Sequence, residues 1–291
     1  MKNVLITGGT GFIGRNLTEQ LQGDYNIFAP NHAELELLDY TALLDYVKQH
    51  SIDAIIHGAI HVPMFNGTEK EFFNDMQMFL NLEKISCMIE KLVYFGSGAE
   101  FDKRYHIKNV TEEDFGKTIP VSEYGLAKYT MTKIARRSDN IFNLRLFGIF
   151  GKYELWNIKF ISNLCCKAIF NLPLTIRKDC AFNFILVDDL PAVIQWVLDD
   201  KPKFHDYNFC HDQSYLLSEL AIMVRGISGK DIEIQMLSDD LNLDYTANNH
   251  RLRTEVSAWQ PTPMDQAIRK LYQYYDEHKR LIDYDILKAS R

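Results

Sequence analysis

The chain has 291 residues, 46% of them hydrophobic, and a formal net charge of −7. We expect one large domain or two closely joined ones, with a sizeable core. Basic residues are scattered, which argues against a nucleic-acid partner. No apolar stretch reaches membrane-spanning length and the start does not resemble a signal peptide, so we expect a cytoplasmic protein without a membrane partner. The five cysteines lack CxxC spacing, which argues against disulfides and a metal site.

The first half of the chain alternates short apolar segments with amphipathic ones. The apolar segments predict strands over 2–6, 25–29, 53–57, 91–96 and 141–146. The intervening segments predict a helix that begins at Phe12 and further helices over 40–49, 69–89 and 123–137. Strands that alternate with helices indicate a parallel sheet covered on both faces. We therefore expect an α/β fold with a Rossmann-type, doubly wound parallel sheet.

Beyond about residue 147 the alternation weakens and loops become frequent. A strand or turn followed by a helix is still expected over 184–199. The remaining elements expected are a helix, a strand and a terminal amphipathic helix, over 216–225, 231–236 and 263–279. We therefore expect a dinucleotide-binding domain over 1–150, to which 184–205 returns. The smaller C-terminal substrate-binding part would comprise 151–183 and 206–291.

A glycine-rich segment, residues 7–14, follows the first predicted strand and opens the first predicted helix. Gly8 permits a tight turn, Gly11 lets backbone N–H groups approach a pyrophosphate, and Gly14 lets the helix pack closely on the strand. Glycines at this spacing between a strand and a helix predict dinucleotide binding. The cofactor is expected to contact Gly8, Gly11, Phe12, Ile13 and Gly14.

The end of the second predicted strand bears on the choice of cofactor. An acid at this point usually holds the adenosine ribose, but the strand here runs into Pro30, Asn31 and His32. Without that carboxylate a 2′-phosphate is not repelled, and Asn31 and His32 could donate hydrogen bonds to it. We therefore expect NADP(H) to be favoured over NAD(H). Glu34 leaves an NAD role open, and His32 could equally be a solvated loop residue.

Tyr124 and Lys128 are four residues apart, which places them on one face of a predicted helix. Lys128 is expected to lower the pKa of Tyr124 from ~10 toward working pH, so that the phenol can exchange a proton with a carbonyl or hydroxyl. Ser97 closes a predicted strand, at the edge where a parallel sheet presents its ligand crevice. We expect these three residues to be catalytic. The alternative is that they are ordinary helix and turn residues.

Together these motifs resemble the extended short-chain dehydrogenase/reductase family of nucleotide-sugar epimerases, dehydratases and ketoreductases. The resemblance covers nearly the whole chain, including residues 187–190 and 259–261. Segment 32–39 looks like that of GDP-fucose synthases and dTDP-4-dehydrorhamnose reductases. The resemblance implies that Asp39 lies near the adenine and Ala59 near the cofactor, and that Lys128 also binds the nicotinamide ribose. It further implies a homodimer that pairs the helices at 69–89 and 123–137.

Two departures from the family pattern concern proton transfer. Ala99 stands where the epimerising synthases have a cysteine, and Lys159 replaces their histidine acid. Epimerisation of a ring carbon through those two groups is therefore not expected, although both positions are expected to line the substrate site. Dehydration would require an acid, and Glu100 is one position out of step with it.

Two further departures concern the binding of a sugar nucleotide. Gly148 replaces an asparagine of the family, and Phe182-Asn183 replace an Arg-Asp pair. Contacts to a diphosphate must then come from elsewhere. The candidates, each of which could equally be a solvated surface charge, are Lys159, Arg177, Lys178 and Arg251.

The resemblance implies NAD(P)H-dependent reduction of a 4-keto nucleotide-linked deoxysugar. Tyr124 would protonate the carbonyl oxygen, Ser97 would orient that oxygen, and Lys128 would adjust the pKa of Tyr124. Two alternatives remain open. One is a nucleotide-sugar 4-epimerase or a dehydratase with tightly bound NAD, and the other is a non-catalytic dinucleotide-binding sensor or scaffold.

Overall fold

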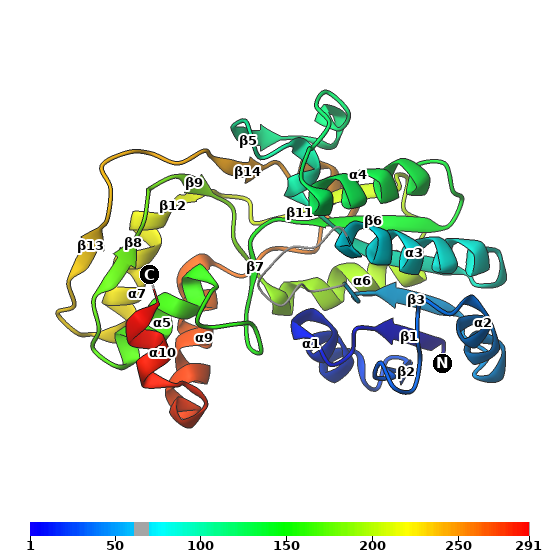
Figure 1. Cartoon of the computed structure of the whole chain (residues 1–291), viewed down its shortest axis with the longest axis horizontal. Helices are drawn as coiled ribbons and strands as arrows, with labels where there is room; N and C mark the ends of the chain where they lie inside the picture. Colours follow the sequence, from blue (N-terminus) through cyan, green and yellow to red (C-terminus); the bar gives the residue numbers. More distant parts are fainter. Residues whose placement is uncertain (61–69, 291) are drawn as a thin grey trace.

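The computed structural model of the chain describes residues 1–60 and 70–290 (Figure 1). A central sheet contains six strands in the order β11-β6-β4-β3-β1-β2, and every neighbouring pair in it is parallel. The strands are β1 (Asn3–Thr7), β2 (Asn26–Phe28), β3 (Ala54–His57), β4 (Lys91–Ser97), β6 (Ile141–Leu146) and β11 (Asp206–Phe209). This arrangement confirms the expected Rossmann-type parallel sheet.

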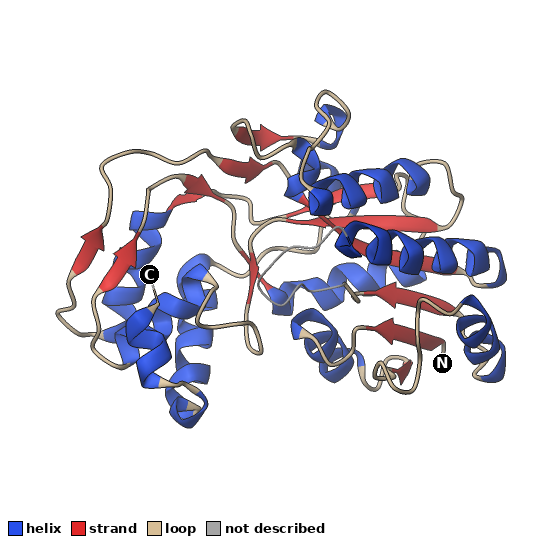
Figure 2. Cartoon of the chain, in the orientation of Figure 1, coloured by secondary structure: helices blue, strands red, loops and turns tan. Residues whose placement is uncertain are grey.

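Helices cover both faces of the central sheet (Figure 2). Successive side chains of a strand point to opposite faces, so Val4 and Ile6 of β1 join one core and Leu5 joins another. The first core contains α1 (Phe12–Leu21) and α6 (Leu190–Asp199). The second contains residues of α2 (Tyr40–Gln49), α3 (Lys70–Ile85) and α4 (Glu123–Ala135). The first residue of the helix expected over 69–89 lies outside the described residues.

The C-terminal part has its own core, in which α5 (Phe160–Ile169), α7 (Leu217–Ser228) and α9 (Met264–Glu277) pack together. The sequence did not predict α5, most of whose residues are buried. Further elements are β7 (Ile149–Phe150), β8 (Leu174–Ile176), β10 (Ile185–Leu186), β13 (Ile234–Met236), α8 (His250–Glu255) and α10 (Tyr284–Ala289). Among the described residues, no helix is both long and apolar enough to cross a bilayer.

A four-stranded sheet connects the C-terminal part to the edge of the central sheet. Its order is β12 (Tyr215–Leu216), β9 (Ala181–Phe182), β14 (Tyr245–Ala247) and β5 (Ile107–Val110). β14 runs parallel to both of its neighbours. A small core of Phe101, Phe147 and Tyr245 lies beside it. The C-terminal part therefore reaches the end of β4.

One expected boundary is wrong. Residues 206–209, which the sequence placed in the substrate-binding part, form β11, the edge strand of the central sheet beside β6. α8 packs on β11, and Trp259 belongs to the same core as the sheet. The strand is short and contains the polar residues Asp206 and Asn208, whose side chains pair with buried Arg145. Hydropathy alone does not distinguish such a strand from a loop.

Candidate active site

The glycine-rich turn after β1 can only be built from glycine at two positions. Gly8 has φ +71°, and a Cβ there would lie 2.7 Å from the backbone nitrogen of Ala59. A Cβ on Gly14 would lie 2.1 Å from the carbonyl oxygen of Gly8. Gly11 is the N-cap of α1 and offers no side chain to its first turn, where no acidic residue occurs. The N–H groups of this turn, which includes Phe12 and Ile13, therefore suit a pyrophosphate.

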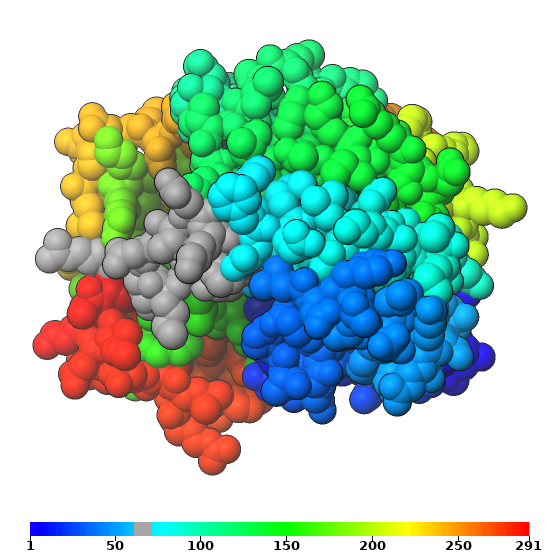
Figure 3. Space-filling model, turned by 45° about the vertical axis from the view of Figure 1, so that its right-hand side comes forward, coloured from blue at the N-terminus to red at the C-terminus, as the bar shows by residue number. Residues whose placement is uncertain are grey.

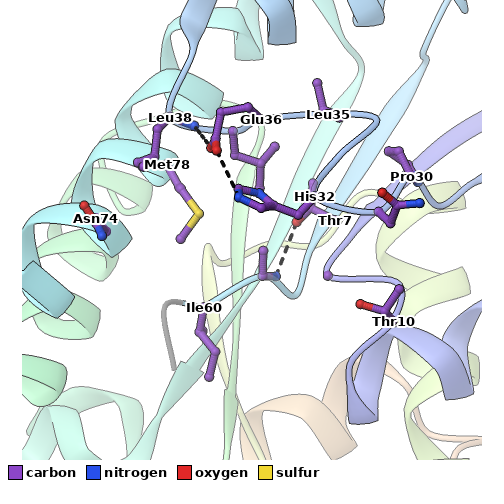
Figure 4. Close-up of a pocket in the computed structure, with 14 residues that line it drawn as sticks. Thr7, Thr10, Pro30, His32, Leu35, Glu36, Leu38, Ile60, Asn74 and Met78 are labelled. Atoms are coloured by element: carbon purple, nitrogen blue, oxygen red, sulfur yellow. Dashed lines mark hydrogen bonds and ion pairs between the residues drawn. The ribbon is translucent and has the colours of Figure 1, made fainter. Parts of the chain in front are cut away.

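A cavity of about 290 Å³ opens beside this turn (Figure 4). It is lined from the ends of β1, β2 and β3, where a Rossmann-type fold receives the adenosine half of a dinucleotide. Its lining includes the predicted cofactor residues Gly8, Asn31, His32 and Ala59. The residues present at this site fit a dinucleotide.

The loop after β2 places a carboxylate in this cavity, and the sequence did not single out that residue. Glu36 lines the cavity, and its carboxylate lies 3.2 Å from Nε2 of His32 (Figure 4). Glu34, which left an NAD role open, instead accepts a hydrogen bond from the backbone N–H of Asn31 at 2.8 Å. The Oδ1 of Asn31 accepts from the backbone N–H of Ala33 at 2.8 Å, so its amide NH₂ is the group left for a ligand.

Asp39 has a structural position in the fold. Its carboxylate caps α2, accepting hydrogen bonds from the backbone N–H groups of Thr41 at 2.8 Å and Ala42 at 3.1 Å. Leu38, its neighbour, lines the cavity. An N-cap carboxylate stabilises a helix by satisfying its first free donors, which explains Asp39 without a cofactor contact.

The structure brings the three predicted catalytic residues together. Ser97 ends β4, and Tyr124 lies in the first turn of α4, which Ser122 caps by accepting from the N–H of Gly125 at 3.2 Å. Lys128 follows one turn later, 3% exposed, with its Nζ 5.9 Å from the centre of the Tyr124 ring. The three side chains therefore meet at the carboxyl edge of the sheet.

The pKa of Tyr124 departs from the expectation. Burial around the hydroxyl raises this pKa, and a hydrogen bond with Ser97 opposes the rise only in part. The ring remains 38% exposed, so a substrate can reach it. Burial also lowers the pKa of Lys128. The direction of this shift is opposite to the lowering expected from Lys128, because burial disfavours the phenolate. Tyr124 holds its proton at neutral pH and is available as an acid.

His57 links the cofactor turn to Lys128. It ends β3, is 2% exposed, and its Nδ1 shares a hydrogen bond of 2.8 Å with the hydroxyl of Thr7. Burial, with a smaller effect of Lys128, lowers the pKa of His57 to about 3. The imidazole is therefore neutral and adds no positive charge beside Lys128.

Glu100 does not face the substrate. Its side chain is fully buried and pairs with Nε of Arg145 at 2.9 Å. It also accepts from the backbone N–H of Ser97 at 3.0 Å, which completes a capping box in the short turn after β4. This carboxylate fixes the turn that carries Ser97 and is not placed as the acid that dehydration needs.

The sequence missed one residue of this site. The hydroxyl of Tyr245, on β14, lies 3.4 Å from Oγ of Ser97, although the two residues are 148 positions apart. Nζ of Lys103 lies 5.0 Å from the centre of the Tyr245 ring. No local pattern marks Tyr245, because its strand has only three residues and its neighbours are polar.

Lys159, which is expected to bind substrate, lies close enough to Lys103 for the two charges to interact. It is exposed at the start of α5, and its charge contributes to lowering the pKa of Lys103, after the larger effect of burial. Ala99 is buried, and its N–H donates to Oγ of Ser97 at 3.2 Å. Arg177 is exposed at the end of β8, which lies beside β13 at the far side of the C-terminal part (Figure 1).

Two further cations proposed for a diphosphate are engaged in ion pairs. Lys178 lies 3.0 Å from a carboxylate oxygen of Asp240. Arg251 pairs with Asp206 at 3.2 Å and with Glu113 at 2.5 Å. Within the described part of the chain, no three His, Cys, Asp or Glu side chains are grouped to hold a metal ion.

A parallel sheet with this glycine-rich turn, and a serine, tyrosine and lysine at its carboxyl edge, defines an NAD(P)-dependent oxidoreductase of the extended short-chain dehydrogenase/reductase type. The chain belongs to the NAD dependent epimerase/dehydratase family, whose model matches residues 4–210.

Individual relatives extend over nearly the whole chain. GDP-L-colitose synthase of Yersinia pseudotuberculosis is 24% identical over 305 residues, covering 95% of this chain and 98% of that protein. A GDP-L-fucose synthetase from Naegleria fowleri, solved with NADP bound, superposes with a TM-score of 0.84 at 16% identity over 96% of this chain and 94% of that one. A GDP-mannoheptose C4 reductase from Campylobacter jejuni, also with NADP bound, superposes with a TM-score of 0.79 at 19% identity. The match covers 94% of this chain and 98% of that one.

Proposed function

We propose that this enzyme uses NADPH to reduce the 4-keto group of a nucleotide-linked deoxysugar. The observation that carries the proposal is the placement of a protonated Tyr124 against Ser97, with Lys128 at its ring. A group that holds its proton at neutral pH suits the reductive direction, in which a carbonyl oxygen must be protonated. The relatives named for GDP-linked sugars and solved with NADP support the substrate class and the cofactor.

Each of the three residues has a separate task in this mechanism. When bound, NADPH would supply the hydride for the carbonyl carbon. Ser97 donates a hydrogen bond to the carbonyl oxygen and orients it, and Tyr124 delivers the proton to that oxygen. Lys128, held against the phenol, stabilises the phenolate that remains and binds the nicotinamide ribose. Neutral His57 leaves Lys128 as the cation at this point.

The preference for NADPH depends on the loop after β2. The NH₂ group of Asn31 and the imidazole of His32 are the donors proposed for a 2′-phosphate. Glu36 works against this preference, because its carboxylate lines the same cavity and lies 3.2 Å from Nε2 of His32. Titration of the purified protein with NADPH and with NADH measures the balance directly.

The homodimer is also a proposal. Helices α3 and α4 lie side by side on the outer surface (Figure 3), and Phe73 of α3 is 66% exposed there. An exposed aromatic side chain on such a helix pair suits a contact with a second copy. The substrate-binding part is proposed to comprise residues 151–183 and the segment after β11.

Replacement of the tyrosine tests the function. Tyr124→Phe should lower turnover of NADPH with GDP-, dTDP-, UDP- or CDP-linked 4-keto-6-deoxyhexoses by about 10²–10⁴-fold, because the proton donor is lost. Binding of NADPH, followed by its fluorescence, should be unchanged. Tyr129→Phe, a buried phenol further along α4, is the matched control. Near wild-type turnover in Tyr124→Phe contradicts the proposal.

The cofactor content of the purified protein separates the alternatives. Stoichiometric NAD⁺ released on denaturation would favour a 4-epimerase, which can use the same three residues, over a reductase. A site that is empty and prefers NADPH supports the reductase. Binding of the dinucleotide without turnover of any of the four 4-keto substrates would indicate a sensor or scaffold.

A further inference from the structure

Tyr245 is held rigidly beside the catalytic serine. Its side chain is buried, and its ring stacks on Phe182 with centroids 4.7 Å apart and packs against Phe147 at 5.1 Å. Nζ of Lys103 covers the ring. Its strand, β14, lies between β9 and β5 and hydrogen-bonds to both. Such packing leaves the phenol few alternative positions.

Gly98, the residue after the catalytic serine, is fitted to this phenol. A Cβ at Gly98 would lie 2.5 Å from the hydroxyl oxygen of Tyr245 and 2.4 Å from the ring of Phe147. Both distances are too short for any side chain, so the turn after β4 needs glycine here because Tyr245 occupies the space. The turn after β4 and the strand β14 are thus complementary in shape.

The departures from the family pattern that concerned sugar-nucleotide binding gather around the same strand. Gly148 has φ +49°, and a Cβ there would lie 2.2 Å from the carbonyl oxygen of Asn183. The backbone N–H of Asn183 donates to the carbonyl oxygen of Tyr245 at 3.1 Å, and its Oδ1 accepts from the N–H of Ala247 at 2.8 Å. Phe182 supplies the stacking ring. These substitutions therefore build a support for Tyr245.

The hydrogen bonds around Ser97 explain what the phenol can do. A serine hydroxyl has one proton to donate and two lone pairs that accept. The N–H of Ala99 donates to one lone pair of Oγ at 3.2 Å, and the hydroxyl of Tyr245 lies 3.4 Å from the same oxygen. Burial raises the pKa of Tyr245, so the phenol keeps its proton. When Tyr245 is the donor in this contact, both lone pairs of Ser97 are filled and the serine has only its proton left to offer.

We propose that Tyr245 is a positioning residue, whose hydroxyl donates to Oγ of Ser97 and so makes the serine a fixed donor toward Tyr124 and the substrate oxygen. The inference rests on the proposed function, because it assigns Tyr245 to the reaction of the same site. In the free enzyme the relay runs from Tyr245 through Ser97 to Tyr124. When substrate is bound, the proton of Ser97 points to the carbonyl oxygen.

Removal of the Tyr245 hydroxyl has two expected effects. The hydroxyl of Ser97 gains other rotamers, so it points to the substrate oxygen for less of the time and kcat falls. The hydrogen bond that Ser97 makes to Tyr124 also weakens, and this bond lowers the pKa of Tyr124. The pKa of Tyr124 therefore rises further, and the loss of reductive activity at high pH moves to higher pH.

Tyr245→Phe tests both effects. We expect kcat for 4-keto sugar reduction to fall on the order of 10-fold, less than for the loss of a donor that touches the substrate directly. The KM for NADPH should stay the same, and the alkaline limb of the pH profile of kcat/KM, which reports the free enzyme, should shift upward. Tyr215→Phe is the control, because it removes from β12, in the same sheet, a phenolic hydroxyl that donates to Gln213. An unchanged kcat and pH profile in Tyr245→Phe overturns the proposal.

A second variant approaches the same contact from the other side. Gly98→Ala should displace Tyr245 and reproduce both effects while NADPH still binds. Adding Tyr245→Phe to it should cause little further loss of kcat. Independent, multiplying losses would overturn the proposal, because the two residues would then not act through one contact. Failure of the Tyr245 proposal can be distinguished from failure of the proposed function, because in the second case Tyr124→Phe would also retain turnover.

Discussion

Glu100 and Glu154 are both buried, the first beneath the catalytic edge of the sheet and the second where the C-terminal part begins. Four donors surround the carboxylate of Glu100, namely the backbone N–H of Ser97 and the side chains of Thr132, Asn143 and Arg145. The carboxylate of Glu154 contacts the hydroxyl of Ser162, while its Oε2 has no hydrogen-bond partner within the described residues.

The difference shows how the same side chain serves two purposes. Where donors and a cation surround it, a buried carboxylate finds a partner for each of its oxygens and holds the backbone in place. Where they are few, burial raises the pKa, and that of Glu154 rises to about 7. Glu100 thus fixes the turn of Ser97, whereas Glu154 changes protonation near neutral pH.

Removal of Glu100 should have the largest effect. Glu100→Ala leaves the buried guanidinium of Arg145 without one of its two carboxylates, and loss of one partner of a buried pair costs about 3–5 kcal/mol. Urea denaturation measures this loss of unfolding free energy. Lys117→Ala, which breaks an exposed pair with Asp114, should cost under about 1 kcal/mol. Equal losses in the two variants would show that the Glu100 network contributes no more to stability than an exposed ion pair does.

Glu154 should produce a pH dependence of intermediate size. Its folded pKa of about 7 lies above the ordinary value of 4.5, so its contribution is complete below pH 4.5 and is lost as pH rises through 7. The unfolding free energy should fall by about 3 kcal/mol across this window. Glu154→Gln, which stays neutral, should remove this fall.

Denaturation of both proteins at several pH values across the window gives the measurement. Glu277→Gln, in which an exposed carboxylate is replaced, should retain the wild-type slope. A Glu154→Gln protein with that same slope would mean that another group is responsible.

The smallest effect is expected from Lys159, whose charge lowers the pKa of Glu154. Lys159→Met removes this cation, so the pKa of Glu154 should rise and the midpoint of the pH-dependent loss should move to higher pH. The same series of denaturation curves detects the shift. Lys178→Met, which instead breaks the pair with Asp240, should leave the midpoint in place. A midpoint that moves down in Lys159→Met would reverse the sign assigned to this interaction.

Local sequence patterns predicted the parts of the fold that depend on local physics. Glycine spacing after β1 and the four-residue step from Tyr124 to Lys128 identified the cofactor turn and the helix of the site. The sequence missed α5, which is mostly buried, and it missed β11 because the polar residues of that strand find buried partners. The position of Tyr245 depends on long-range packing, which no single sequence window contains.

The sign of the pKa shift at Tyr124 was also beyond the sequence. The spacing to Lys128 indicated a nearby cation, but the degree of burial, which raises the pKa, follows from how α4 packs on the turn after β4. Similarly, the sequence showed the approach of the Asn31 loop to the cofactor, but not that Glu36 turns into the cavity.

The position of β14 in its sheet matters for the order in which the nascent chain can fold. It is the last strand of its sheet to leave the ribosome, yet it lies inside that sheet, between β9 and β5. N-terminal regions generally fold first, so the partners on both sides are complete before the strand that joins them exists. A chain interrupted before residue 245 already contains the glycine turn and the three residues predicted to be catalytic, Ser97, Tyr124 and Lys128. The group proposed to orient Ser97 arrives only afterwards, which makes catalytic competence a late event in the life of the nascent enzyme.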